Sequence, residues 1–154
     1  MMPEPGQPAP LFTLRDGEGN TVSLADLRGR RVVLFFYPKD LTSGCTQEAC
    51  DFRDRHAAFA EAGALVYGIS PDSEKSHLKF TAKHELPFPL LSDPGSVVCE
   101  LYGVWKQKSM YGRTYMGVER TTFLIDAEGT VAQVWGKVKV PSHASAVLTA
   151  VQGG

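Results

Sequence analysis

Apolar side chains gather in three runs that have the pattern of buried β-strands. Residues 31–37, 64–70 and 90–91 are nearly continuous stretches of apolar and β-branched side chains. Such runs are typical of strands that are covered on both faces. Pro38 ends the run of residues 31–37, and we expect these residues to form the central strand.

Shorter alternating segments predict two hairpins at the ends of the chain. Residues 11–14 and 21–22 flank a polar, glycine-containing turn, which predicts an N-terminal hairpin followed by a helical turn capped by Ser23. Near the C-terminus, residues 121–126 and 130–135 flank a turn that ends in glycine. This pattern predicts a second hairpin.

Helical periodicity is clearest between the first two long strands. Ala49, Phe52 and Phe59 recur with the 3.6-residue period, and Gly63 stands where a helix should end, so we expect one helix over residues 43–62.

Capping signals and composition predict three further helices. Residues 106–119 are polar, contain glycine and lack a period, so they are expected to form a loop. The helices are expected from Asp72 or Ser73 to His84, from Pro94 to Tyr102, and at the C-terminus, with Pro141 in the first turn and Gly153-Gly154 beyond the end.

Strands that alternate with helices and end in a hairpin predict an α/β protein. Because β-α-β crossovers are right-handed and cover a sheet, we expect a central mixed β-sheet flanked by helices, with an N-terminal hairpin extension. A thioredoxin-like fold fits this order best. No linker or repeat interrupts the chain, so residues 1–154 are expected to form a single domain.

Composition narrows the class of partner and the compartment. The chain has 154 residues, and 16 Lys plus Arg against 17 Asp plus Glu give a net charge of -1, so neither nucleic acid nor a membrane surface is an expected partner. No apolar run approaches a membrane span, and the first residues lack a secretory pattern. Three cysteines are too few for a secreted disulfide framework. We expect a cytoplasmic protein.

The connection between the central strand and its helix carries the candidate chemistry. If Thr42 is the N-cap, Cys45 is the third helical residue, close to unpaired backbone N–H groups and to the positive end of the helix dipole. Both favour the thiolate, which is the nucleophilic form of cysteine. Gly44 would allow a substrate to approach the backbone closely.

Pro38, Thr42 and Cys45 reproduce the P-x-x-x-T-x-x-C motif of the peroxiredoxins. The chain resembles the bacterioferritin comigratory protein or PrxQ branch of that family, over nearly its whole length. The other matching features are Cys50, Gly103-Val104-Trp105 and residues 119–126.

The resemblance implies a role for each residue of the site. Cys45 would be the peroxidatic cysteine, Pro38 would shield its thiolate, and Thr42 would hydrogen-bond the peroxide. Arg120 would face the sulfur, where its positive charge would favour the thiolate. Cys50 would resolve the sulfenic acid formed on Cys45 before a second peroxide can oxidise it further.

The implied activity is that of a thiol-dependent peroxidase that reduces hydrogen peroxide and organic hydroperoxides. Its reductant would be thioredoxin or a similar dithiol, and we expect a monomer with no cofactor and no metal. Cys99 lies among apolar residues and is expected to be a core residue.

Three other kinds of site or enzyme fit the cysteines less well than a peroxidase does. A structural zinc site of Cys45, Cys50, His56 and Cys99 lacks the paired-cysteine spacing of common zinc modules. A disulfide oxidoreductase would ordinarily carry Cys-x-x-Cys at this junction, and it is the enzymatic runner-up. A cysteine hydrolase needs a histidine base, and no histidine spacing nominates one.

Helix geometry sets a condition on the implied disulfide. Five residues along an α-helix advance about 7.5 Å and turn about 140°, which places the α-carbons of Cys45 and Cys50 roughly 8 to 9 Å apart. A disulfide needs an α-carbon separation of no more than about 7 Å. We therefore expect the segment from about Thr42 to Phe52 to unwind when the bond forms.

Overall fold

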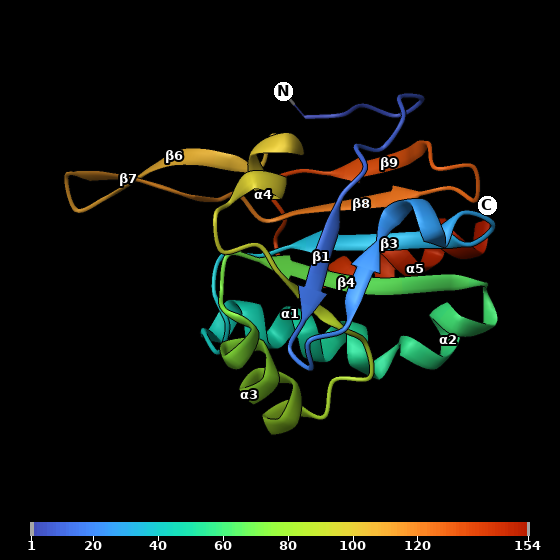
Figure 1. The fold of residues 1–154 in the computed structure, drawn as a ribbon, viewed down its shortest axis with the longest axis horizontal. Coiled ribbons are helices and arrows are strands. Elements are labelled where there is room, and N and C mark those ends of the chain that lie inside the picture. The colour runs from blue at the N-terminus through green and yellow to red at the C-terminus, as the bar shows by residue number, and fades with distance from the viewer. Residues whose placement is uncertain (1, 154) are drawn as a thin grey trace.

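The computed structural model describes residues 2–153, which are built around a seven-stranded sheet of order β2-β1-β5-β4-β3-β8-β9 (Figure 1). Strands β3, β4 and β5 pair in parallel, and the other pairs are antiparallel. The strands are β1 (Thr13–Asp16), β2 (Thr21–Ser23), β3 (Arg31–Phe36), β4 (Ala64–Ser70), β5 (Leu90–Ser92), β8 (Thr121–Ile125) and β9 (Val131–Trp135).

Helices cover both faces of this mixed sheet, because its central strand is apolar on both sides. Val33 and Phe35 of β3 pack into a core with α1, α2, α3 and α5, whereas Leu34 and Phe36 pack into a second core with α4 and the short 3-10 helix η1. The predicted thioredoxin-like α/β fold is confirmed. The helices are η1 (Leu24–Leu27), α1 (Ser43–Asp54), α2 (His56–Glu61), α3 (Glu74–His84), α4 (Val97–Leu101) and α5 (His143–Gly153).

The single helix predicted over residues 43–62 is wrong, because the chain forms two helices that are separated at Arg55. The Arg55 side chain donates to the carbonyl of Asp51 at 3.0 Å, which is the acceptor that its own amide would use in a continuous helix. The Arg55 amide bonds to Phe52 instead. The break keeps Phe52 and Phe59 fully buried in one core.

The loop predicted over residues 106–119 is also wrong, because this segment forms a hairpin of β6 (Trp105–Met110) and β7 (Arg113–Val118). Tyr111 and Gly112 have φ of 52° and 76°, a pair of positive values that suits a tight hairpin turn. Figure 1 shows the hairpin extending away from the main sheet. Most of its side chains are exposed, so it lacks the apolar alternation that marks a packed strand.

Two helix ends differ from the prediction. Pro141 precedes α5 instead of lying in its first turn, because Ser142 between them has φ 66°, which is left-handed. Gly153 is the last residue of α5, and Gly154 lies outside the described residues. Ser23 occupies the N-cap position of η1 as predicted, but its hydroxyl bonds to the Thr13 hydroxyl at 2.8 Å and makes no capping bond.

The remaining predicted strands and helices are confirmed with small differences at their ends, and Ser73 caps α3 by accepting from the amide of Ser76 at 3.1 Å. Within residues 2–153, no helix is both long enough and apolar enough to span a membrane.

Candidate active site

Cys45 lies in the first turn of α1, just after the loop that connects the central strand β3 to this helix. Thr42 is the N-cap residue with extended backbone, so Cys45 is the third residue of the helix, as predicted. Its side chain is only 2 % exposed. The sulfur therefore sits near the positive end of the helix dipole, in a site that largely excludes water.

Arg120, the residue just before β8, extends its side chain to this sulfur. Its Nη2 donates to Cys45 Sγ at 3.3 Å, and its Nη1 donates to Glu48 Oε1 at 2.7 Å. Gly44 makes room for the guanidinium, since a Cβ there would lie 3.3 Å from Nη2. Burial opposes the charge on Arg120, but Glu48 and Cys45 together raise the pKa of Arg120 above its ordinary value.

Glu48 is a member of the site that the sequence interpretation missed. It is 1 % exposed, and its Oε2 has no hydrogen-bond partner among the described residues. Burial raises the pKa of Glu48 from 4.5 to about 7, against the opposing attraction of Arg120. The signal that could have found it is its spacing, because a residue three positions after Cys45 lies on the same helix face.

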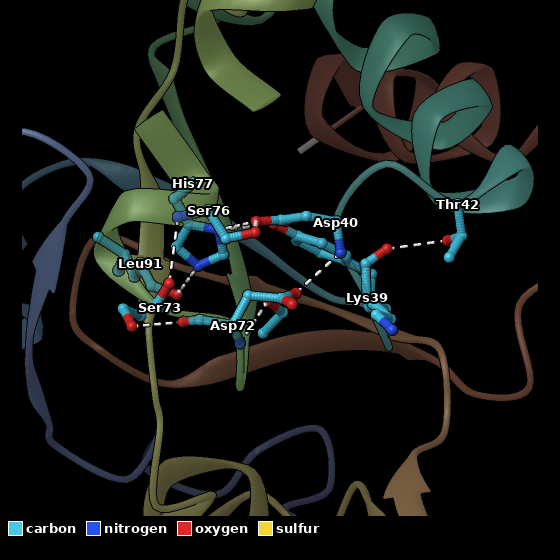
Figure 2. Close-up of polar contacts among 11 residues, drawn as sticks. Lys39, Asp40, Thr42, Asp72, Ser73, Ser76, His77 and Leu91 are labelled. Carbon is cyan, nitrogen blue, oxygen red and sulfur yellow. Dashed lines mark hydrogen bonds and ion pairs between the residues drawn. The ribbon is translucent and has the colours of Figure 1, made fainter. Parts of the chain in front are cut away.

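Among the described residues, Thr42 makes no hydrogen bond to the Cys45 sulfur. Its hydroxyl donates to the Lys39 carbonyl at 2.8 Å, within the loop that leads to α1 (Figure 2). The single proton of the hydroxyl is thereby engaged, which leaves the oxygen free to accept a hydrogen bond. Pro38 is half-buried at the start of the same loop.

A buried polar network anchors this loop through Asp40. The Asp40 carboxylate accepts from the Tyr37 hydroxyl at 2.6 Å and from the Ser76 hydroxyl at 2.8 Å, and it lies 2.7 Å from His77 Nδ1. The Asp40 amide donates to Asp72 at 2.8 Å. Figure 2 shows Asp40 between the side chains of α3 and Asp72. These bonds hold the loop, and sequence inspection found none of them.

Burial, followed by the nearby Asp40 carboxylate, raises the pKa of Tyr37 well above its ordinary value. The Tyr37 hydroxyl therefore remains protonated and acts as a donor to Asp40.

The three cysteines are free and lie in three different settings. Cys50 is half-buried on α1, and its Sγ lies 3.8 Å from His84 Nδ1. Cys99 is fully buried in the core on the other face of the sheet from Cys45. Burial, with a smaller contribution from Asp93, raises the pKa of Cys99 far above its ordinary value. Cys99 is therefore a core residue, as expected.

The geometry argues against the alternative of a metal site. A zinc site that includes Cys45 and Cys99 would have to cross the sheet. Asp40, Asp72 and His77 are close enough together to hold a metal ion, but Asp40 already bonds to both of the others.

A hydrolase would need a histidine on the Cys45 sulfur, yet Arg120 is the one hydrogen-bond partner of Sγ found within residues 2–153. His143 lies near Arg120 but bonds to the Thr122 hydroxyl at 2.7 Å. Burial, and secondarily Arg120, lowers the pKa of His143 to about 4. His143 is therefore neutral at physiological pH and turned toward β8.

A thioredoxin-like sheet that presents one cysteine at a helix N-terminus, beneath an arginine, defines a thiol-based redox protein. Comparison with known proteins narrows this class. The model of the AhpC/TSA family matches residues 5–134. A putative peroxiredoxin bcp of Coxiella burnetii is 54% identical over 145 residues, which cover 94% of this chain and 96% of that protein. Peroxiredoxin Bcp of Bacillus subtilis is 52% identical over 145 residues, covering 94% and 92%.

Solved structures give the same result. Peroxiredoxin Q of Xanthomonas campestris superposes with a TM-score of 0.88 at 45% identity, over 92% of this chain and 90% of that one. PrxQ of Xylella fastidiosa superposes with a TM-score of 0.94 at 35% identity, over 99% and 98%. The chain belongs to the AhpC/TSA family, within its peroxiredoxin Bcp and PrxQ branch. It is therefore a peroxidase enzyme.

Proposed function

We propose that Cys45 is the peroxidatic cysteine of this enzyme and that its thiolate attacks the terminal oxygen of a hydroperoxide. The O–O bond breaks, Cys45 becomes a sulfenic acid, and the leaving oxygen departs as water or an alcohol after it takes a proton. The observation that carries this proposal is the hydrogen bond of 3.3 Å from Arg120 to the sulfur of a buried cysteine at a helix N-terminus.

Arg120 supports the chemistry because charge moves from the sulfur to the departing oxygen during the attack. A guanidinium fixed by Glu48 is already oriented toward this region, so it stabilises the transition state without reorganisation. We assign Thr42 the role of accepting a hydrogen bond from the bound peroxide, since the Thr42 hydroxyl donates its own proton to the Lys39 carbonyl. Pro38 would shield the site from water.

The substrate is proposed to be hydrogen peroxide or an organic hydroperoxide. A solved structure of the Xanthomonas campestris bacterioferritin comigratory protein, 44% identical to this chain, is described in terms of alkyl peroxide reduction activity. That similarity supports an organic hydroperoxide as one substrate of this enzyme.

Cys50 is the proposed resolving cysteine. Its thiol would condense with the Cys45 sulfenic acid to form a disulfide and release water, after which thioredoxin or a similar dithiol would reduce the disulfide to two thiols. Cys45 and Cys50 both lie within the continuous helix α1. The first turns of α1 must therefore unwind before the bond can close.

We also propose that residues 1–154 act as one domain and as a monomer. Both cores lie on one sheet, which supports a single cooperative unit. Sedimentation of the reduced protein tests the oligomeric state, and a dimer at working concentrations would contradict it.

Turnover with thioredoxin and its reductase tests the cysteine assignments. We expect Cys45→Ser to abolish peroxide consumption, Cys50→Ser to block thioredoxin-dependent recycling, and Cys99→Ser, the matched control, to turn over normally. Retained turnover in Cys45→Ser would contradict the proposal. Reduction of insulin-type disulfides without consumption of peroxide would instead favour the disulfide oxidoreductase.

A further inference from the structure

His84 is the last residue of α3 and faces the proposed resolving cysteine. Its Nδ1 lies 3.8 Å from Cys50 Sγ, a separation that fits a weak hydrogen bond between a thiol and an imidazole. Arg53 of α1 fixes the backbone of the same residue by donating to the His84 carbonyl at 2.8 Å. Both Cys50 and His84 are half-buried, so the pair is oriented but reachable by solvent.

We propose that His84 is a catalytic residue for disulfide formation and that it accepts the proton of the Cys50 thiol. The inference rests on the proposed function, in which Cys50 resolves the sulfenic acid. Attack on that sulfur requires a thiolate, and an ordinary thiol is mostly protonated at neutral pH. A histidine in hydrogen-bond contact with a cysteine is the usual arrangement for activating such a nucleophile.

The charges around the pair suit a transient imidazolium and thiolate. The C-terminal end of α3 carries the negative end of the helix dipole, which stabilises an imidazolium at His84. Arg53 interacts favourably with a negative charge on Cys50. The other charged groups in this region are Asp54 of α1, which pairs with Arg53 at 3.0 Å, and Lys83 and Glu85 at the end of α3. Together with Arg53 they carry two positive and two negative charges, so the region has no net charge.

The step balances without another reactant. Cys50 gives its proton to His84, and the resulting thiolate forms an S–S bond with the sulfur of Cys45. The S–O bond of the sulfenic acid breaks at the same time. The departing hydroxide takes the proton from His84 and leaves as water, so His84 returns to its neutral state.

Packing favours a reaction in which Cys50 stays near His84 while Cys45 moves. Ala49 and Phe52, on either side of Cys50, are completely buried, and the Phe52 ring stacks on Phe35 with centroids 4.7 Å apart. The first helical residues Ser43 and Gly44 are exposed or half-buried. Unwinding is therefore less costly at the Cys45 end of α1 than beyond Cys50.

Single-turnover kinetics with His84→Gln test this role, with Lys83→Gln as the matched control in the same helical turn. Reduced protein is mixed with one equivalent of hydrogen peroxide. Oxidation of Cys45 and formation of the disulfide are then followed separately by acid quenching and mass spectrometry across a range of pH. The rate of Cys45 oxidation in the same samples reports whether the variant is folded.

We expect His84→Gln to oxidise Cys45 at the normal rate but to form the disulfide about 10²-fold more slowly near neutral pH, the usual effect of losing a general base. The defect should shrink at about pH 9, where a free thiol ionises unaided. Lys83→Gln should behave like the wild type.

An unchanged rate of disulfide formation in His84→Gln would overturn the inference, and so would a defect of equal size at every pH, since that is what a purely structural role produces. A Cys50→Ser protein that still forms an intramolecular disulfide would instead overturn the assignment of Cys50 in the proposed function. The two failures are therefore distinguishable.

Discussion

Arg120 binds two acidic groups at once, and this sharing sets the electrostatics of the site. One nitrogen of the guanidinium donates to the Cys45 sulfur and another to the Glu48 carboxylate. Because Glu48 has a pKa of about 7, it is partly neutral at physiological pH. A neutral Glu48 leaves the positive charge of Arg120 to the sulfur.

Replacing Arg120 should separate its contribution from that of the helix terminus. We expect Arg120→Met to slow the oxidation of Cys45 by about 10² to 10³-fold, the range seen when one oriented donor is lost. Alkylation of Cys45 by iodoacetamide should also require a higher pH than in the wild type, because a nearby positive charge is removed. Arg113→Met, at an exposed position on the hairpin, is the control. An unshifted alkylation profile would mean that the helix terminus alone activates the sulfur.

Glu48 should give the stability of the protein a specific pH dependence. Its folded-state pKa is raised, so the folded protein keeps a proton that the unfolded chain releases. The resulting stabilisation is fully present below pH 4.5 and is lost as the pH rises to about 7. We expect this loss to reach about 3 kcal/mol and to be absent in Glu48→Gln.

Denaturant unfolding of the two proteins across this pH range measures the difference directly. Taking the difference removes the opposite contribution of His143, whose lowered pKa makes stability fall as the pH drops from 6.5 to about 4. Glu61→Gln, at an exposed position on α2, is the control. Parallel stability curves for the wild type and Glu48→Gln would rule out a raised pKa at Glu48.

Single-residue predictions succeeded where the information was local. The N-cap position of Thr42 and the place of Cys45 in the first turn follow from short-range capping rules. Asp40 and Glu48 escaped notice because their partners come from distant parts of the chain, His77 in one case and Arg120 in the other. A charged residue in a helix or loop is ordinarily exposed, so burial was expected of neither one, although the spacing of Glu48 from Cys45 places both on one helix face.

At the scale of single elements, the two ends of α1 differ in how tightly they are packed. The ring of Phe52 is buried against Phe35, whereas Thr42 and Ser43 at the helix start are exposed. The geometry of the helix keeps Cys45 and Cys50 too far apart for a disulfide. The proposed disulfide between Cys45 and Cys50 would therefore need a local unfolding step that leaves the rest of the fold in place.

Hydrogen exchange of the reduced and disulfide forms should reveal this step. We expect the amides from Thr46, the first that donates within the helix, to about Cys50 to lose protection in the disulfide form, because their helical hydrogen bonds are broken. The amides of α3 should be equally protected in both forms and serve as an internal control. Equal protection of α1 in both forms, with the disulfide confirmed by mass, would eliminate the proposed unwinding.

The hairpin of β6 and β7 shows why one element was missed entirely. Within residues 2–153 its strands pair only with each other, and of their side chains only Trp105 and Val118 pack against a core. Most positions of the hairpin therefore need no alternating apolar pattern. Its turn contains Tyr111 at positive φ, although glycine or asparagine is the usual signal for that position. The buried strands β3 and β4 were recognised because contact with two cores favours apolar residues at nearly every position.

Across the whole molecule, the sheet separates Cys45 from Cys99. Cys45 packs in the core formed with α1 and α5, and Cys99 packs in the core on the opposite face. The sheet therefore keeps Cys99 away from a sulfenic acid on Cys45 while the fold is intact. The order of strands and helices along the chain was enough to predict this architecture, because crossover rules restrict how such elements can be arranged.

The most direct test of the central claim is to map the oxidised cysteines after one equivalent of hydroperoxide. Reduced protein is treated with the hydroperoxide while dimedone is present to trap any sulfenic acid. The protein is then digested and analysed by mass spectrometry. We expect a disulfide between Cys45 and Cys50 in the wild type and a dimedone adduct on Cys45 in Cys50→Ser. An adduct on Cys50 or Cys99, with Cys45 left as a free thiol, would contradict the account.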